Sequence, residues 1–144
     1  MAHDPVRAAD ARAWLEKATL DLRSAEVDLA AQPAITGDAL FHCKQAVEKA
    51  LKGLLAWHDE PFGKTHDLAE LGARVAALEA RLEPLLRQAA PLTQYAWRYR
   101  YPGEPNEPPR SEAYTALGMA REVVATAVQR LPLSARPASR SQPL

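Results

Sequence analysis

The residue types best suited to chemistry are concentrated over positions 41–52, which read Phe-His-Cys-Lys-Gln-Ala-Val-Glu-Lys-Ala-Leu-Lys. At about 100° per residue, a helix here places four polar side chains within an arc of roughly 80°. These are His42, Gln45, Lys49 and Lys52. An imidazole, an amide and two ammonium groups are suited to holding phosphate oxygens. The alternative is an ordinary solvated helix face with a Glu48–Lys52 pair.

Two further segments carry candidate functional residues. Positions 64–68 read Lys-Thr-His-Asp-Leu, so His66 lies beside a helix start that either binds an anion or is only capped by Thr65 or Asp67. Positions 95–102 read Tyr-Ala-Trp-Arg-Tyr-Arg-Tyr-Pro. Interleaved arginines and aromatics suit base stacking and phosphate contact, and Arg100 and Tyr101 are the candidates. They equally suit a packed helix end before a proline.

The elements that position these residues follow from apolar spacing. Steps of three and four predict helices over about 8–31, 38–58, 67 onwards and 111–131, with Asp38 and Ser111 as caps. Pro84 and Pro91 are expected to break or restart the third helix. Low glycine content and no alternating run favour an all-α fold, an antiparallel four- to five-helix bundle. We expect a flexible N-terminus over 1–9, a bundle over 10–131 and a disordered tail over 132–144.

Composition narrows the function classes. The 144 residues carry 18 basic and 18 acidic side chains, which argues against binding of nucleic acid by bulk charge alone. No apolar stretch reaches the length of about 18 residues that a membrane span needs, and no secretory signal is visible, so we expect a cytoplasmic protein. The single cysteine, Cys43, falls on the apolar stripe of its helix and is expected to be buried. The histidine spacing predicts no metal site, and we expect no cofactor.

Together these segments resemble the HEPN family, the higher eukaryotes and prokaryotes nucleotide-binding domain. The residues that carry the resemblance lie in four places: Trp14-Leu15, Lys17-Ala18 and Asp21-Leu22; Phe41-His42, Gln45-Ala46 and 48–52; Thr65-His66-Asp67-Leu68; and Arg100-Tyr101-Pro102. The resemblance spans about residues 10–131. It implies an all-α bundle that is commonly dimeric, and a minimal nucleotidyltransferase as partner in a toxin–antitoxin-like pair.

The family resemblance also implies metal-independent ribonuclease activity, which in many HEPN proteins rests on an Arg-x(4–6)-His motif. This sequence departs from that motif, because none of its four histidines follows an arginine at the required spacing. Three hypotheses therefore stand. The chain is a non-catalytic module that binds a nucleotide or RNA phosphate; or a ribonuclease toxin with a rearranged site of His42, His66 and Arg100; or a structural protein that pairs with itself and a partner.

Overall fold

The computed structural model describes residues 4–103 and 106–138, and within these ranges it contains helices and no strand. The all-α prediction is therefore confirmed. Five α-helices and three short 3-10 helices follow one another along the chain: α1 (Pro5–Ala30), α2 (Thr36–Trp57), α3 (Leu68–Leu78), η1 (Ala80–Leu82), α4 (Glu83–Ala89), η2 (Ala90–Ala96), α5 (Arg110–Arg130) and η3 (Leu133–Ala135). None of the described helices is long and apolar enough to cross a bilayer.

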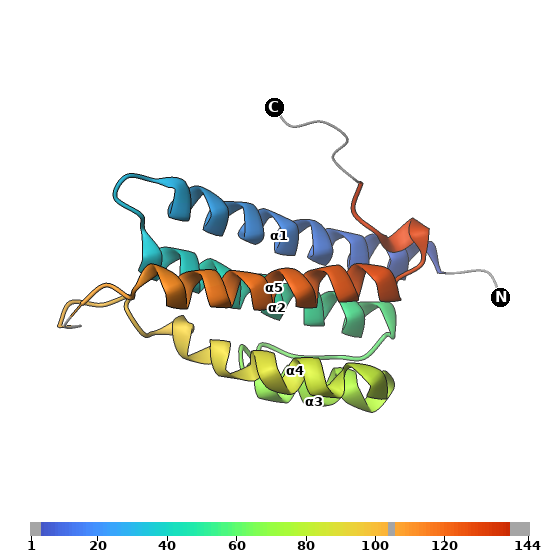
Figure 1. Cartoon of the computed structure of the whole chain (residues 1–144). Helices are drawn as coiled ribbons and strands as arrows, with labels where there is room; N and C mark the ends of the chain where they lie inside the picture. The colour runs from blue at the N-terminus through green and yellow to red at the C-terminus, as the bar shows by residue number, and fades with distance from the viewer. Residues whose placement is uncertain (1–3, 104–105, 139–144) are drawn as a thin grey trace.

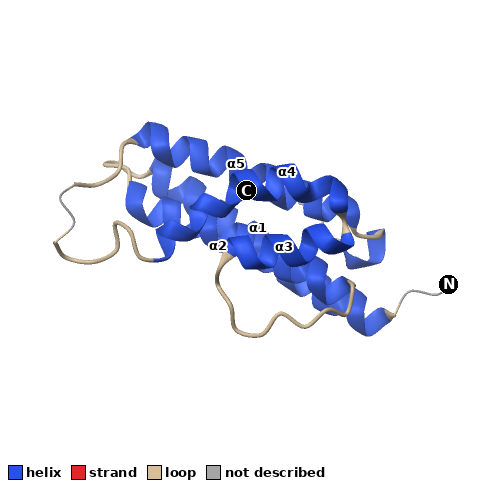
Figure 2. Ribbon diagram, turned by 90° about the horizontal axis from the view of Figure 1, so that it is seen from below, coloured by secondary structure: helices blue, strands red, loops and turns tan. Residues whose placement is uncertain are grey.

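Three long helices, α1, α2 and α5, lie lengthwise side by side, and the shorter α3 and α4 pack below them (Figure 1). A long loop joins α2 to α3 and runs along the bundle (Figure 2). Helix α2 is central, because α1, α5, α3 and η2 all contact it. This position explains why most of its residues are buried, including charged ones.

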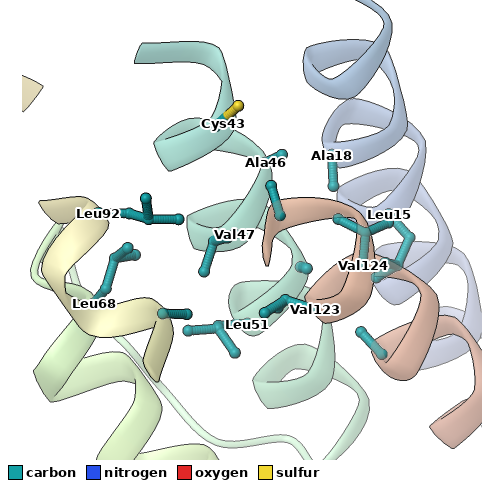
Figure 3. Close-up of a cluster of buried hydrophobic side chains, with 14 of the residues drawn as sticks. Leu15, Ala18, Cys43, Ala46, Val47, Leu51, Leu68, Leu92, Val123 and Val124 are labelled. Carbon is teal, nitrogen blue, oxygen red and sulfur yellow. The ribbon is translucent and has the colours of Figure 1, made fainter. Parts of the chain in front are cut away.

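The core lies between α2 and its neighbours. Val47 and Leu51 of α2 face Leu68 and Leu92 on one side, while Val123 of α5 closes the other (Figure 3). The apolar stripe predicted for the second helix is buried along its whole length: Leu40, Cys43, Val47, Leu51 and Leu54. Burial of large aliphatic side chains contributes about 1.5–3 kcal/mol each, so this stripe is one substantial contribution to the stability of the bundle.

The helix boundaries differ from the expectation at both ends of the domain. Helix α1 begins at Pro5, because the Asp4 carboxylate accepts the Val6 N–H at 2.9 Å and proline suits the first helical turn. Residues 5–9 are therefore helical rather than flexible, and residues 1–3 lie outside the described part.

After α5 the structure describes residues 132–138, which belong to the segment that we expected to be a disordered tail. Residues 133–135 form η3, which packs on α1, and Ala135 is buried. The Arg136 guanidinium donates to the Leu131 and Gln129 carbonyls at 2.8 and 3.2 Å. The expectation for residues 139–144 falls outside the described residues.

Prolines and caps divide the second half of the chain. Asp67 caps α3 by accepting the Ala69 N–H at 2.9 Å. Pro84 and Pro91 stand in the first turns of α4 and η2, so the predicted restarts are confirmed. The N-cap of α5 is Pro109 and not Ser111, which lies inside the first turn of that helix.

Candidate functional site

The polar arc predicted on α2 is divided by the fold between two networks. His42 and Lys49 contact Asp21 of α1, whereas Lys52 is only 5% exposed and lies against Trp14, nearer the start of α1. A single solvated face of four polar groups is therefore not formed, because α1, with Trp14, and Phe62 of the loop after α2 cover Lys52. Each network has its own carboxylate at the centre.

The first network is centred on Asp21 of α1. Its carboxylate contacts His42 Nδ1 at 2.9 Å and accepts from Lys49 Nζ at 2.6 Å. His42 Nε2 lies 3.3 Å from an Asp38 carboxylate oxygen one turn earlier on α2. Asp28 lies beside Asp38, and burial together with this second carboxyl raises the pKa of Asp28 to about 6. The network is rich in carboxylates, so it is a poor place for a phosphate.

The second network is centred on Glu48, which is 4% exposed. Its carboxylate accepts from Lys44 Nζ at 3.0 Å and Lys52 Nζ at 3.1 Å, and contacts His66 Nδ1 at 3.0 Å. Burial by itself raises the pKa of Glu48, but the hydrogen bonds from His66, Lys44 and Lys52 outweigh burial and hold this pKa below its ordinary value. Two buried ammonium groups thus share one carboxylate.

Aromatic rings extend the second network in both directions. Lys52 Nζ lies 5.6 Å from the ring centroids of both Trp14 and Phe62. Toward the start of α2, Lys44 Nζ lies 5.5 Å from the Phe41 ring, and the Arg100 guanidinium carbon lies 3.6 Å from the same ring. Cation–π contacts of this kind hold cations over aromatic faces. They also link Arg100, distant in sequence, to the α2 segment.

The remaining predicted residues have the following surroundings. Gln45 accepts from Lys44 Nζ at 2.6 Å through its amide oxygen, which leaves the amide NH₂ available as a donor. The His66 side chain is 68% exposed despite its contact with Glu48. Tyr101 is 63% exposed beside Arg100. No hydrogen bond, ion pair or ring contact joins His42 to His66 or to Arg100 within the described residues.

Two residues that follow Arg100 and Tyr101 in the sequence, Glu107 and Pro108, contact the start of α2. The Glu107 carboxylate accepts the Gly37 N–H at 3.2 Å, and the Thr36 hydroxyl donates to the Pro108 carbonyl at 2.8 Å. A carboxylate at a helix N-terminus is favoured by the exposed N–H groups and the helix dipole. These contacts hold Glu107 and Pro108 against the start of α2, the same end of the helix at which Arg100 contacts Phe41.

The sequence analysis did not propose three residues of these networks as site residues: Asp21 and Glu48, which it named only in the family resemblance and in a surface pair, and Lys44. Lys44 and Glu48 lie outside the predicted arc and look like a routine pair at i and i+4 on an exposed helix. Asp21 carried a signal, since it lies close to the apolar stripe of α1 between Ala18 and Ala25. A carboxylate in such a place needs a partner from a neighbouring helix.

Cys43 is fully buried, as predicted from its place on the apolar stripe. Burial raises the pKa of its thiol to about 12. A thiol in this state is almost entirely protonated at neutral pH and is a weak nucleophile. Cys43 therefore belongs to the core.

Comparison with known proteins gives one family match. The family model for the HEPN domain matches residues 11–131, which covers most of the 144-residue chain and all five α-helices in whole or in large part. No curated protein and no solved structure matches the chain. The extent of the match, together with the all-helical fold, shows that this chain belongs to the HEPN domain family.

Proposed function

We propose that this HEPN chain is a non-catalytic module that binds the phosphate groups of a nucleotide or of RNA at the surface formed by Arg100, Gln45 and His66. The observation that carries this proposal is the Arg100 guanidinium, stacked on Phe41 with no carboxylate partner among the described residues. A planar guanidinium fixed on an aromatic ring keeps its N–H donors pointing outward, and these match phosphate oxygens in pairs.

The charge around this surface supports an anionic ligand. Lys44, Lys52 and Arg100 place three basic groups beside α2, and Glu48 is the carboxylate bonded to the two lysines. Basic groups therefore outnumber acidic ones among these four residues, although the chain as a whole has a net charge of zero. Such a field attracts an anion and favours its retention where water is partly excluded.

Each proposed contact residue offers a donor that its present partners leave available. Gln45 has its NH₂ group, because its amide oxygen contacts Lys44. His66 contacts Glu48 through Nδ1, so its Nε2 is a donor to phosphate in the doubly protonated ring. Lys49 and His42 are held by Asp21 instead, and we assign them no phosphate contact. Tyr101 and Trp97, 63% and 56% exposed, offer faces for a base.

Isothermal titration of the full chain with ATP, GTP and a short single-stranded RNA tests this function. We expect Arg100→Ala to weaken binding by about 10- to 100-fold, the equivalent of one charge-assisted hydrogen bond. Arg98→Ala is the matched control, because Arg98 donates to the Gln94 amide at 2.7 Å and stacks on Tyr99. It should change the affinity by less than about threefold. Absence of binding at millimolar ligand overturns the proposal.

A cleavage assay separates this function from the ribonuclease alternative. We expect RNA to remain intact with the wild type, since His42 is bonded to Asp21 and His66 to Glu48, and the Phe41 ring contacts both Arg100 and His42. General acid–base catalysis needs these groups within hydrogen-bond reach of the same substrate. Cleavage that disappears in a folded His42→Ala/His66→Ala/Arg100→Ala variant would replace our proposal with the enzymatic one.

We also propose a homodimer and a minimal nucleotidyltransferase as the partner in a toxin–antitoxin-like pair. Family membership supports both, and exposed aromatic side chains of the kind enriched at interfaces, Trp97, Tyr101 and Tyr114, occur in the segment 97–114. Light scattering should give about twice the chain mass of 15.8 kDa. A monomer at high micromolar concentration contradicts the dimer, and failure to co-purify with a co-expressed nucleotidyltransferase contradicts the partner.

A further inference from the structure

Three side chains of the kind that ligate metal ions meet where the α1–α2 hairpin turns. One ligand atom each from Asp28, Asp38 and His42 lies within 4.8 Å of the other two. Ligands at about 2.1 Å from a tetrahedral ion are roughly 3.4 Å apart, so the distances between the three ligand atoms need to shorten by at most about 1.4 Å. Asp38 and His42 are already at 3.3 Å.

The hairpin itself holds the three groups in register. Asp28 lies in the last turn of α1, and its backbone carbonyl accepts the Ile35 N–H at 2.9 Å across the connection. Asp38 and His42 follow one turn apart on α2, which places both side chains on the same face. The arrangement therefore comes from two rigid helices and not from a flexible loop.

One oxygen of the Asp28 carboxylate has no hydrogen-bond partner. The side chain is partly buried and interacts with the Asp38 carboxyl group, while its buried Oδ2 atom has no hydrogen-bond donor among the described residues. Neither Asp28 nor Asp38 pairs with a lysine or arginine in the described part of the chain, and His42 is the basic group that contacts Asp38. A buried carboxylate oxygen without a donor is costly, and a bound cation would satisfy it.

The neighbouring Asp21 prepares the imidazole for coordination. Its carboxylate lies 2.9 Å from His42 Nδ1 and is held in turn by Lys49 at 2.6 Å. When Nδ1–H donates to Asp21, the lone pair of the neutral ring lies on Nε2, the nitrogen that faces Asp38. Histidines that bind metals are oriented by such a carboxylate on the opposite nitrogen.

A cavity of about 280 Å³ adjoins two of the three groups, Asp28 and His42. It is lined by Leu20, Arg23, Ser24, Val27, Asp28 and His42. An ion held by three protein ligands has at least one further coordination position, and this space can hold a water or a small anion in it. The cluster thus has three ligands, the Asp21 carboxylate that orients the imidazole, and a cavity through which an ion can enter.

From this geometry we propose that Asp28, Asp38 and His42 bind one divalent first-row transition ion, Zn²⁺ or Mn²⁺. A nitrogen ligand with two carboxylates suits these ions better than Mg²⁺ or Ca²⁺, which prefer oxygen alone. The sequence predicted no metal site because its histidines lack local spacing. Here the ligands come from two helices, and just one of them is a histidine.

Titration of the metal-free full chain with ZnCl₂, MnCl₂ and MgCl₂ tests the site. We expect one equivalent of Zn²⁺ to bind, Mn²⁺ to bind more weakly in the Irving–Williams order, and Mg²⁺ to bind weakest. Asp28→Asn/Asp38→Asn should weaken Zn²⁺ binding by at least about 100-fold, because both charged ligands are lost. Glu26→Gln is the matched control and should bind as the wild type does, since Glu26 pairs with Arg121 at 3.2 Å outside the cluster.

Imidazole nitrogen spectra of the wild type give a second readout that needs no variant. Zn²⁺ should shift Nε2 of His42 while Nδ1 keeps its proton. The proposal is overturned if no Zn²⁺ binds at millimolar concentration, if binding survives in the double variant, or if His42 resonances do not respond. Arg100→Ala should leave Zn²⁺ affinity unchanged, which separates this site from the proposed phosphate surface.

Discussion

Glu48 is a buried charged residue whose hydrogen bonds to lysines replace its hydration. It is 4% exposed and accepts from two ammonium groups that are themselves buried, Lys44 and Lys52. Three charged groups lose most of their hydration here, and their mutual attraction has to offset that cost. The Glu48 carboxylate is the counter-charge of both Lys44 and Lys52.

Glu48→Gln should destabilise the protein by about 3–5 kcal/mol, because it leaves two buried ammonium groups without a counter-charge. Urea unfolding measures this loss. The control replaces the whole triad, as Glu48→Leu/Lys44→Met/Lys52→Met. It should be more stable than the single variant, since apolar replacement of a complete buried ion cluster is often neutral or stabilising. A single variant as stable as the wild type would contradict the interpretation.

Glu48 also predicts a specific pH dependence. Its pKa is lower in the folded than in the unfolded chain. The stability that it contributes is therefore complete above the ordinary glutamate pKa of about 4.3 and is lost as the pH falls through the lower folded value. The free energy of unfolding, measured from pH 5 down to pH 3, should fall more steeply for the wild type than for Glu48→Gln. Equal slopes would show that Glu48 titrates normally.

At the level of elements, the contact between α1 and α2 depends on one glycine. A Cβ built on Gly53 would lie 2.2 Å from Leu15 Cδ2 and 3.2 Å from Trp14 Cβ. Leu15 is fully buried and has little room to move. Gly118, within α5, has no atom within 4 Å of such a Cβ.

The two glycines therefore predict opposite effects of the same substitution. Gly53→Ala should destabilise the protein by about 1–3 kcal/mol through overpacking. Gly118→Ala should stabilise it by up to about 1 kcal/mol, because alanine is the better helix former. Thermal unfolding of both variants measures the difference. The close approach of α1 and α2 would be disproved if Gly53→Ala were as stable as Gly118→Ala.

At the level of the whole molecule, zero net charge limits how nucleic acid can bind. Binding through the proposed surface uses a local excess of cations, so few counterions are released. Arg100 and His66 are the contact residues that can carry charge, while Gln45 is neutral and releases no counterion. On single-stranded RNA the plot of log affinity against log salt should therefore have a slope between about −0.7 and −1.4. Fluorescence polarisation of a labelled RNA at several salt concentrations measures it.

The slope of log affinity against log salt also distinguishes this small surface from a broad basic surface. Arg100→Ala should reduce its magnitude by about 0.7, the share of one phosphate contact on a single strand. A slope of −5 or steeper in the wild type would indicate a broad basic surface and contradict the proposed three-residue contact.

Several features of this protein follow from the sequence alone. Apolar residues at steps of three and four determined the helices and their buried faces, and Pro84, Pro91 and Asp67 marked boundaries that the structure confirms. These are local effects, since a proline lacks an N–H and a cap bonds its own helix. The motif residues also indicated the family, which the match over residues 11–131 confirms.

The tertiary structure alone decided which polar groups meet. Periodicity placed His42, Gln45, Lys49 and Lys52 on one arc, yet α1 supplies Asp21 to one part of the arc while Trp14 and Phe62 cover another. Helical spacing describes one helix at a time and cannot show which neighbour packs against it. A central helix has neighbours on most sides, so the partners of its charged residues, and the Asp28–Asp38–His42 cluster, are determined by the packing of other elements.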